Sequence, residues 1–337
     1  MNKLIKNWDC QITTKKKLWY TISISLIVIG LIITAIFGFN IGIDFSGGTV
    51  VTFTADNLVT NSNVDSYMDT IVSTLESEGI EVEVQQTIEQ DGDIGVQVRY
   101  QNTVNGTSLS DADMFAVNDE IEALLYTAVK AELSAQNTSE TAVSIESKAM
   151  IEMSTVGASA SAELLLNAFI SVLAAAALIL LYVAIRFELW SGVSAVIALA
   201  HDILIMIAFV AIFQIQINAS FVAALITIVG YSINNTIVLF DRLRENKAKY
   251  TMRDATPSEL VNTSIKDTMT RSINTTITTL VTITILAIIG VSAIKEFAIP
   301  IIIGLLAGTY SSIFIAPTLW GLFQDLKIKK AKAAAKK

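Results

Sequence analysis

Six long apolar runs constrain the fold of this chain more than any other feature. A run of about 20 apolar residues can cross a bilayer as a helix, and a membrane-spanning backbone must satisfy its own hydrogen bonds. Composition agrees, because 53% of the residues are hydrophobic and only 16% are charged. The sequence therefore predicts an α-helical polytopic membrane protein with six transmembrane helices, at approximately residues 18–39, 164–185, 193–213, 221–240, 273–294 and 297–323.

Basic residues are unevenly distributed around these runs. Lysines precede the first run, Arg186 follows the second, residues 241–272 are rich in Arg and Lys, and residues 326–337 form a basic tail. Positively charged segments stay in the cytoplasm, so we expect residues 1–17, the loop 241–272 and the tail to be cytoplasmic. The first run is too long for a cleaved signal and predicts a retained helix. The tail is expected to be solvated, with membrane lipid as a second contact.

Residues 40–160, between the first two spans, have the composition of a water-soluble domain. They contain few basic residues, which predicts an extracytoplasmic location. Apolar spacing predicts strands at 49–54, 82–88, 94–100 and 142–147, helices at 62–79 and 111–133, and a hairpin turn at 90–93. This order predicts an α+β ferredoxin-like (βαββαβ) domain whose role is binding.

A glycine-rich turn joins the first span to this domain. Asp44, Gly47 and Gly48 lie in the sequence NIGIDFSGGT at residues 40–49. It lacks the Gly-Lys ending of a phosphate loop and the spacing of a dinucleotide site, so a helix-to-strand connector is the simplest interpretation.

Catalytic and metal-binding patterns are scarce in the sequence. Cys10 is the single cysteine and His201 the single histidine, which excludes an internal disulfide and makes a histidine metal site improbable. We find no nucleophile and base pair, no paired intramembrane aspartates and no zinc motif. We therefore expect a protein that is not an enzyme, with no cofactor, no metal and no nucleic-acid partner.

Several polar residues interrupt the apolar runs. At membrane depth such groups must face other helices or a wet cavity, so they indicate either a functional site or interhelical hydrogen bonds of about 0.6 to 2 kcal/mol each. Glycines in the same spans are expected to be helix-packing positions. The polar candidates are Tyr231, Ser232, Asn234, Asn235, His201, Asp202 and Arg271, and the packing candidates are Gly230, Gly304 and Gly308.

Six motifs follow one another along nearly the whole chain. They are GIDFSGG at 42–48, RFE at 186–188, ALAHD at 198–202, IVGYSINNTIVLFDRLREN at 228–246, SIKDTMTR at 264–271 and GTYSSIFIA at 308–316. In this order they resemble the SecF-type members of the SecD/SecF family of protein-export membrane proteins, within the RND superfamily.

The resemblance implies half of an RND-type helix bundle in the bacterial plasma membrane. It further implies an accessory subunit that works with SecD, the SecYEG channel and, as a further candidate, a YidC-type insertase. Its expected role is to drive late translocation of unfolded polypeptides with the proton motive force or a sodium gradient. The alternatives are a structural subunit of the same complex that conducts no ion, and a small-molecule exporter of the RND type.

One position departs from the family pattern. Asn235 stands where the family usually has an aspartate that works with an arginine of the next span, here Arg271. An amide cannot titrate, so the proton mechanism carries over only in part. Three explanations remain open: conduction through SecD alone, Asp202 as the titrating group, or sodium held by amide and hydroxyl oxygens.

Overall fold

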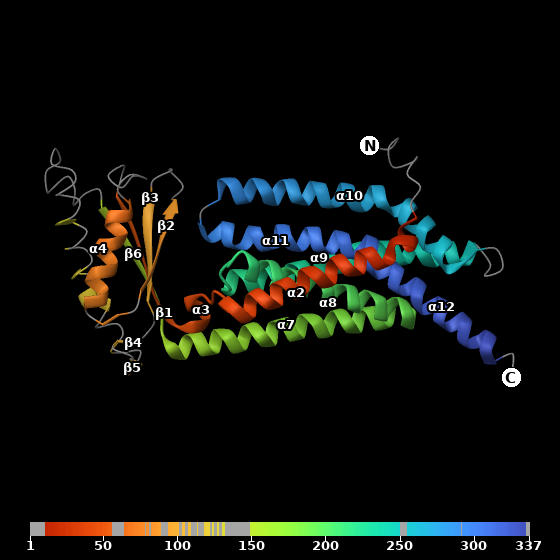
Figure 1. Cartoon of the computed structure of the whole chain (residues 1–337), viewed down its shortest axis with the longest axis horizontal. Coiled ribbons are helices and arrows are strands. Elements are labelled where there is room, and N and C mark those ends of the chain that lie inside the picture. Colours follow the sequence, from red (N-terminus) through yellow and green to blue (C-terminus); the bar gives the residue numbers. More distant parts are fainter. Residues whose placement is uncertain are drawn as a thin grey trace. The chain divides into compact units, whose positions relative to one another are not determined.

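The computed structural model divides the chain into two compact units (Figure 1). The helical unit comprises residues 1–40, 170–288 and 295–337, and the second unit is formed mainly by residues 41–169. The structure describes residues 11–55, 64–77, 79–80, 82–88, 94–100, 103–104, 107–108, 113, 118–121, 123–124, 127, 130–131, 149–249, 255–290 and 292–334.

The predicted six spans are confirmed by six helices that are long and apolar enough to cross a membrane. The last of them is interrupted by a π-helical turn, η2 (Ser311–Ile315), between α11 and α12. A short 3-10 helix, η1 (Ile12–Lys15), precedes the first. The helices are α2 (Lys16–Phe37), α7 (Ala158–Arg186), α8 (Leu189–Ile212), α9 (Ala219–Lys249), α10 (Pro257–Ile289), α11 (Ser292–Tyr310) and α12 (Ala316–Ala334).

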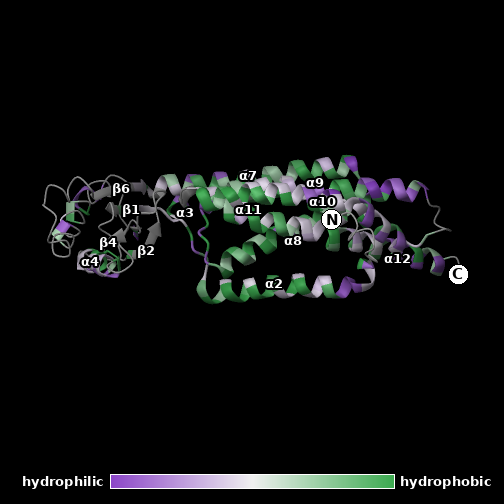
Figure 2. Ribbon diagram, turned by 90° about the horizontal axis from the view of Figure 1, so that it is seen from above, coloured by the Kyte–Doolittle hydropathy of each residue, from purple (hydrophilic) through white to green (hydrophobic). Residues whose placement is uncertain are grey.

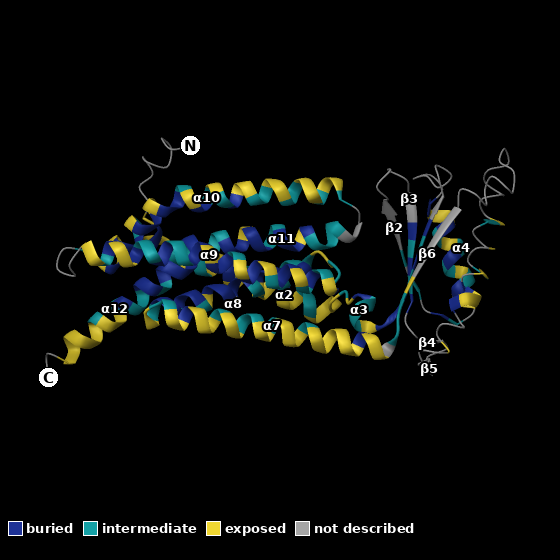
Figure 3. Cartoon of the chain, turned by 180° about the vertical axis from the view of Figure 1, so that it is seen from behind, coloured by how far each residue is buried: buried dark blue, intermediate teal, exposed yellow. Residues whose placement is uncertain are grey.

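The helical unit has an inner and an outer set of helices. Along the apolar membrane-spanning stretch of each helix, 56% of α8 is buried, against 6% of α7 and 11% of α2 and α10. Figure 3 shows the same contrast between exposed α7 and buried α8. Figure 2 shows that the residues of α2 are largely hydrophobic, as expected of a helix that faces lipid.

Glycine allows the inner helices to approach closely. A Cβ added at Gly304 would lie 2.5 Å from the Ile228 side chain and 2.8 Å from Met206 Sδ. A Cβ added at Gly30 would lie 2.3 Å from Ala208 Cβ, where α2 crosses α8. Close backbone approach of this kind is a main source of helix association in membranes.

The segment 241–272, which we expected to be a loop, is largely helical. Helix α9 continues to Lys249, and α10 begins at Pro257. The expected tail is likewise part of α12 up to Ala334. The fifth span also ends earlier than residue 294, because α10 ends at Ile289.

The second unit contains a four-stranded antiparallel sheet in the order β2-β3-β1-β6. The helix α4 (Val64–Ser77) buries Val64, Tyr67, Ile71 and Leu75 on one face. The strands are β1 (Gly48–Ala55), β2 (Val82–Ile88), β3 (Ile94–Tyr100) and β6 (Ala149–Val156), with a separate pair β4 (Thr103–Val104) and β5 (Thr107–Ser108).

Three strands and one helix of this unit were predicted close to their observed bounds. The last strand lies further along the chain than predicted, because β6 pairs with β1 from Gly48 opposite Val156 to Ala55 opposite Ala149. The expected strand at 142–147 and the hairpin at 90–93 lie outside the described residues, as does most of the expected helix at 111–133.

Candidate functional site

A buried carboxylate at the middle of α8 receives hydrogen bonds from three elements. Asp202 is 1% exposed. Its Oδ1 lies 2.9 Å from His201 Nδ1 on the same helix. Its Oδ2 accepts hydrogen bonds from Ser311 Oγ of η2, at 2.7 Å, and from the Ser232 hydroxyl of α9. Asp202 therefore joins α8, α9 and η2 through side-chain contacts.

The polar contacts continue from His201 to the first span. Ser23 Oγ of α2 lies 2.9 Å from His201 Nε2. The Tyr310 ring is stacked on the imidazole, with ring centroids 6.0 Å apart, and its hydroxyl donates to the Trp19 carbonyl at 2.8 Å. The result is a chain of polar groups that runs from α2 through His201 and Asp202 to α9 and η2.

The π-helical turn supplies one of these donors. A π-bulge inserts an extra residue into a helical turn, and such turns are frequent at functional sites. Ser311 opens η2 and is fully buried against Asp202. One turn earlier, a Cβ added at Gly308 would lie 3.0 Å from Ser232 Cβ. Glycine at 308 thus lets α11 come close to α9, beside the Ser232 hydroxyl.

This arrangement can hold a charge at membrane depth. An isolated carboxylate in the bilayer interior is costly, whereas donors from hydroxyl and imidazole groups offset part of that cost. The His201 imidazole and the hydroxyl groups of Ser232 and Ser311 surround the Asp202 carboxylate with hydrogen-bonding groups. Protonation of the carboxylate removes its negative charge and weakens the hydrogen bonds from Ser232 and Ser311.

An apolar cavity of about 210 Å³ adjoins this network. His201, Ser23 and Tyr310 contribute to its wall, together with apolar side chains of α2, α8 and α11. The imidazole therefore lies between the buried carboxylate and a space next to the outer helix α2. In the described part of the chain, no three His, Cys, Asp or Glu side chains form a group that could hold a metal ion.

Asn235 is buried but makes no hydrogen bond to this network among the described residues. It is 3% exposed, and its Nδ2 has no hydrogen-bond partner among the described residues. Tyr231 donates to Thr279 at 3.5 Å, and Asn246 donates to Ser264 at 3.0 Å. These two contacts are in antiparallel register, which places Asn235 level with residue 275 of α10, about one helical turn from residue 271.

Arg271, the expected partner of Asn235, is exposed on α10. Among the described residues, its side chain has no hydrogen bond or ion pair, so the structure does not join it to Asn235. Asn234 is exposed on the neighbouring helix. Gly230 is exposed as well, and a Cβ added there would meet no atom within 4 Å. Packing within this chain therefore explains Gly304 and Gly308, but not Gly230.

The glycine-rich turn forms a short helix followed by two glycines. Asp44 lies in the first turn of α3 (Ile43–Ser46), and Gly47 and Gly48 have φ angles of 71° and 139°. A Cβ added at Gly48 would lie 2.5 Å from the Tyr100 carbonyl oxygen. The chain can enter β1 in this way only with glycine at 48.

Sequence reasoning identified Asp202 and Ser232 but missed three of the contacts. Ser23 is one of several hydroxyl residues in the first apolar run, which also contains Thr21, Ser25 and Thr34. Tyr310 appeared only as part of a motif, and Ser311 only as a small residue suited to helix packing. The feature that marks these residues in the sequence is a polar side chain inside an apolar span. Which spans bring such residues together could not be read from the sequence.

Comparison with known proteins identifies similar sequences and structures. The chain matches the family described as "Protein export membrane protein SecD/SecF, C-terminal" over residues 134–325, and the "SecD/SecF GG Motif" over residues 32–57. It is 34% identical over 316 residues to Protein translocase subunit SecF of Alicyclobacillus acidocaldarius, covering 93% of this chain and 92% of that protein.

Longer relatives are also similar. The chain is 32% identical over 330 residues to Protein translocase subunit SecDF of Bacillus subtilis, covering 97% of this chain and 40% of that protein. The crystal structure of a Thermus SecDF, described as a translocon-associated membrane protein, matches with a TM-score of 0.69 and 31% identity. That match covers 93% of this chain and 38% of the SecDF chain. The chain thus spans about 40% of the length of the SecDF proteins that it matches.

Proposed function

Because this chain belongs to the SecD/SecF family of protein-export membrane proteins, we propose that it acts as an accessory subunit of the Sec protein-export machinery. It works with a SecD-type partner in the bacterial plasma membrane. Together they drive the late translocation of unfolded polypeptides through SecYEG at the expense of an ion gradient. A YidC-type insertase is a further partner to test.

The buried Asp202 network is the observation that carries this proposal. An ion gradient can do mechanical work only if ion binding changes the relative stability of two conformations. Asp202 is suited to this, because its hydrogen-bond donors come from α9 and η2 as well as from α8. A proton on Asp202 weakens contacts between helices, so its charge state and the helix arrangement are linked. Asn235 cannot contribute in this way because an amide does not titrate.

The exposed faces of α9 and α10 support a membrane-embedded partner. Polar side chains are costly in lipid, and small residues allow close helix packing. One stripe on α9 exposes small and polar residues at helical spacing, and one on α10 exposes an arginine, an amide and two hydroxyls. The stripes are Ala223, Thr227, Gly230 and Asn234, and Arg271, Asn274, Thr278 and Thr282.

Several finer features belong to the same proposal. The second unit is a ferredoxin-like domain outside the cytoplasm, and the sheet order β2-β3-β1-β6 supports it. That order is the one in which a split βαβ fold arranges its four strands. The chain termini and residues 241–272 are cytoplasmic, which is supported by the basic residues at those positions.

The proposal is tested by gradient-dependent export in proteoliposomes that contain SecYEG, this chain and its SecD partner. We expect Asp202→Asn to remove the stimulation of export by an imposed proton gradient, because it keeps the size and shape of the side chain but cannot titrate. Asp325→Asn, the same change in the middle of α12 and outside this network, is the matched control and should leave the stimulation intact.

The other outcomes assign the function differently. If Asp202→Asn retains full stimulation, conduction belongs to SecD and this chain is a structural subunit. If stimulation persists without a proton gradient and depends on a sodium gradient, the coupling ion is sodium and not the proton. If neither gradient stimulates export but small molecules are transported, the exporter alternative holds.

A further inference from the structure

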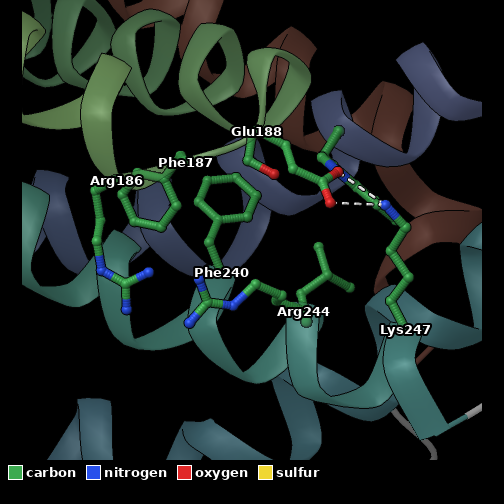
Figure 4. Close-up of a pocket in the computed structure, with 9 residues that line it drawn as sticks. Arg186, Phe187, Glu188, Phe240, Arg244 and Lys247 are labelled. Atoms are coloured by element: carbon green, nitrogen blue, oxygen red, sulfur yellow. Dashed lines mark hydrogen bonds and ion pairs between the residues drawn. The ribbon is translucent and has the colours of Figure 1, made fainter.

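A basic pocket lies at the end of the helical unit where α7 ends and α8 begins (Figure 4). It has a volume of about 110 Å³. Its walls come from the turn between these helices, from the last turns of α9 and from α12. The lining residues are Arg186, Phe187, Glu188, Ser191, Phe240, Leu243, Arg244, Lys247 and Trp320.

The cations of this basic pocket outnumber the carboxylates beside them. Arg186 binds both carboxylate oxygens of Asp241, at 2.6 and 2.8 Å. Arg244 contacts Asp241 Oδ1 at 3.3 Å, and Lys247 lies 2.8 Å from Glu188 Oε2. Three positive groups therefore meet two negative ones. One further negative charge would balance the group.

Arg244 has unused N–H donors that could bind a further negative group. Its side chain is 56% exposed, and its single described ion pair is the 3.3 Å contact with an aspartate that Arg186 already holds. A guanidinium has five N–H donors. Figure 4 shows the Arg186 and Arg244 guanidinium groups on one side of the Phe187 and Phe240 rings, and Lys247 reaching Glu188 on the other.

The surroundings of the pocket are apolar. Phe187 and Phe240 meet edge to face, with centroids 6.0 Å apart, and Trp320 is 2% exposed. The residues that flank this turn in sequence point outward, since Ile185 is 80% exposed and Leu189 is 73% exposed. Exposed apolar side chains on membrane helices face acyl chains. A ligand with a negative head and apolar tails fits both surfaces.

We propose that the basic pocket binds the phosphate of an anionic phospholipid headgroup. Arg244 supplies the free donors, Arg186 and Lys247 supply positive potential, and the acyl chains lie along the apolar surface around Ile185 and Leu189. The single negative charge of a phosphodiester balances the pocket. Basic pockets between helices at the membrane surface recognise anionic headgroups by this chemistry. This site is separate from the Asp202 network and does not depend on ion coupling.

Native mass spectrometry of the full chain in detergent tests the proposal. The protein is titrated with phosphatidylglycerol or with phosphatidylcholine, and the affinity of the first bound lipid is measured. We expect phosphatidylglycerol to bind more tightly. Arg244→Gln should weaken its binding about fivefold, the effect of one basic residue at a membrane surface. Lys249→Gln removes the same charge from an exposed position on the same helix and should have no effect.

Three results would overturn the assignment. Equal affinity for phosphatidylglycerol and phosphatidylcholine would show that the net charge of the headgroup does not determine binding. Equal binding by the Arg244→Gln and Lys249→Gln proteins would place the lipid elsewhere. Displacement of phosphatidylglycerol by inorganic phosphate would make the basic pocket a site for free phosphate rather than for lipid. Unfolding of each variant is measured in parallel, so that a loss of lipid is compared between folded proteins.

Discussion

Asp202 accepts hydrogen bonds from residues of α9 and η2. The contribution of a single hydroxyl group to stability can therefore be measured by removing it. Ser311 and Ser312 are neighbours in η2, and both are buried. Ser311 donates to the Asp202 carboxylate, whereas Ser312 donates to the Thr309 carbonyl of its own helix at 3.0 Å. Ser311 Oγ also lies 3.2 Å from the Gly308 carbonyl oxygen, so the contact that distinguishes the two serines is the one with the carboxylate.

We expect Ser311→Ala to lower the free energy of unfolding by about 1.5 to 3 kcal/mol, the usual contribution of a hydrogen bond to a charged group. Ser312→Ala should cost less, because a neutral hydroxyl bond to a helix carbonyl contributes about 0.5 to 1.5 kcal/mol. Denaturant unfolding of the purified protein in detergent measures both. An equal loss for the two variants would mean that the Asp202 carboxylate is neutral or does not need the Ser311 hydroxyl.

The sequence predicted the residues of this network better than their contacts. Asp202 and Ser232 stood out because ionisable and hydroxyl groups are expensive at membrane depth. The pairing of Asn235 with Arg271 was expected from the resemblance, and in the structure Arg271 is exposed while the Asn235 Nδ2 has no partner among the described residues. Contacts between helices that are distant in the chain depend on how each helix is rotated about its axis. That rotation cannot be read from a single sequence.

At the level of elements, the charged residues at the end of α9 and the start of α10 show why charge alone is a poor guide to loops. Their charged side chains form ion pairs, one within α9 and one between α9 and α10. Arg242 contacts Glu245 at 2.7 Å on its own helix and Asp267 at 2.9 Å on α10. Helices that leave the membrane can remain helical in water when such pairs and tertiary contacts replace apolar burial.

The sequence contains a signal for the start of α10 that the interpretation of residues 241–272 as a loop overlooked. Thr256, Pro257 and Glu259 form a capping box with proline at the first helical position. The Glu259 carboxylate accepts from the Thr256 N–H at 2.7 Å, and the Thr256 hydroxyl accepts from the Glu259 N–H at 3.3 Å. This signal predicts a helix start at 257, well before the apolar run at 273.

We expect Thr256→Ala to destabilise the first turn of α10 by about 0.5 to 2 kcal/mol, because it removes an N-cap. The measurement is amide hydrogen exchange over residues 257–262, which should become faster. Thr263→Ala changes an exposed threonine inside the same helix and should leave exchange unchanged or slow it, since alanine has the higher helix propensity. Similar exchange in both variants would show that tertiary contacts alone hold this helix end.

At the scale of the whole molecule, length and composition predicted the six spans, and alternation predicted β1, β2 and β3. These are strong signals because each depends on one segment only. The position of β6 was not predicted, since its pairing with β1 is a contact between segments far apart in the chain. The division into inner and outer helices also escaped prediction, because all six runs are similarly apolar.

The chain exposes polar and small residues where a membrane protein should expose apolar ones. It also spans only about 40% of the SecDF proteins that it matches. Both facts are explained if a second half of the bundle, contributed by a SecD-type partner, covers the stripes on α9 and α10. Gly230 is the most informative position, because a Cβ added there would meet no atom within 4 Å among the described residues.

We therefore expect Gly230→Leu to leave the folding of the isolated chain unchanged and to weaken its association with SecD about tenfold, or about 1.4 kcal/mol. Fluorescence energy transfer between labelled partners in liposomes measures the association. Ala177→Leu adds the same side chain to the exposed face of α7 and should have no effect. If both variants associate like the native protein, Gly230 faces lipid and the partner binds another surface. If Gly230→Leu lowers the stability of the isolated chain, the open space beside α9 is filled within this chain itself.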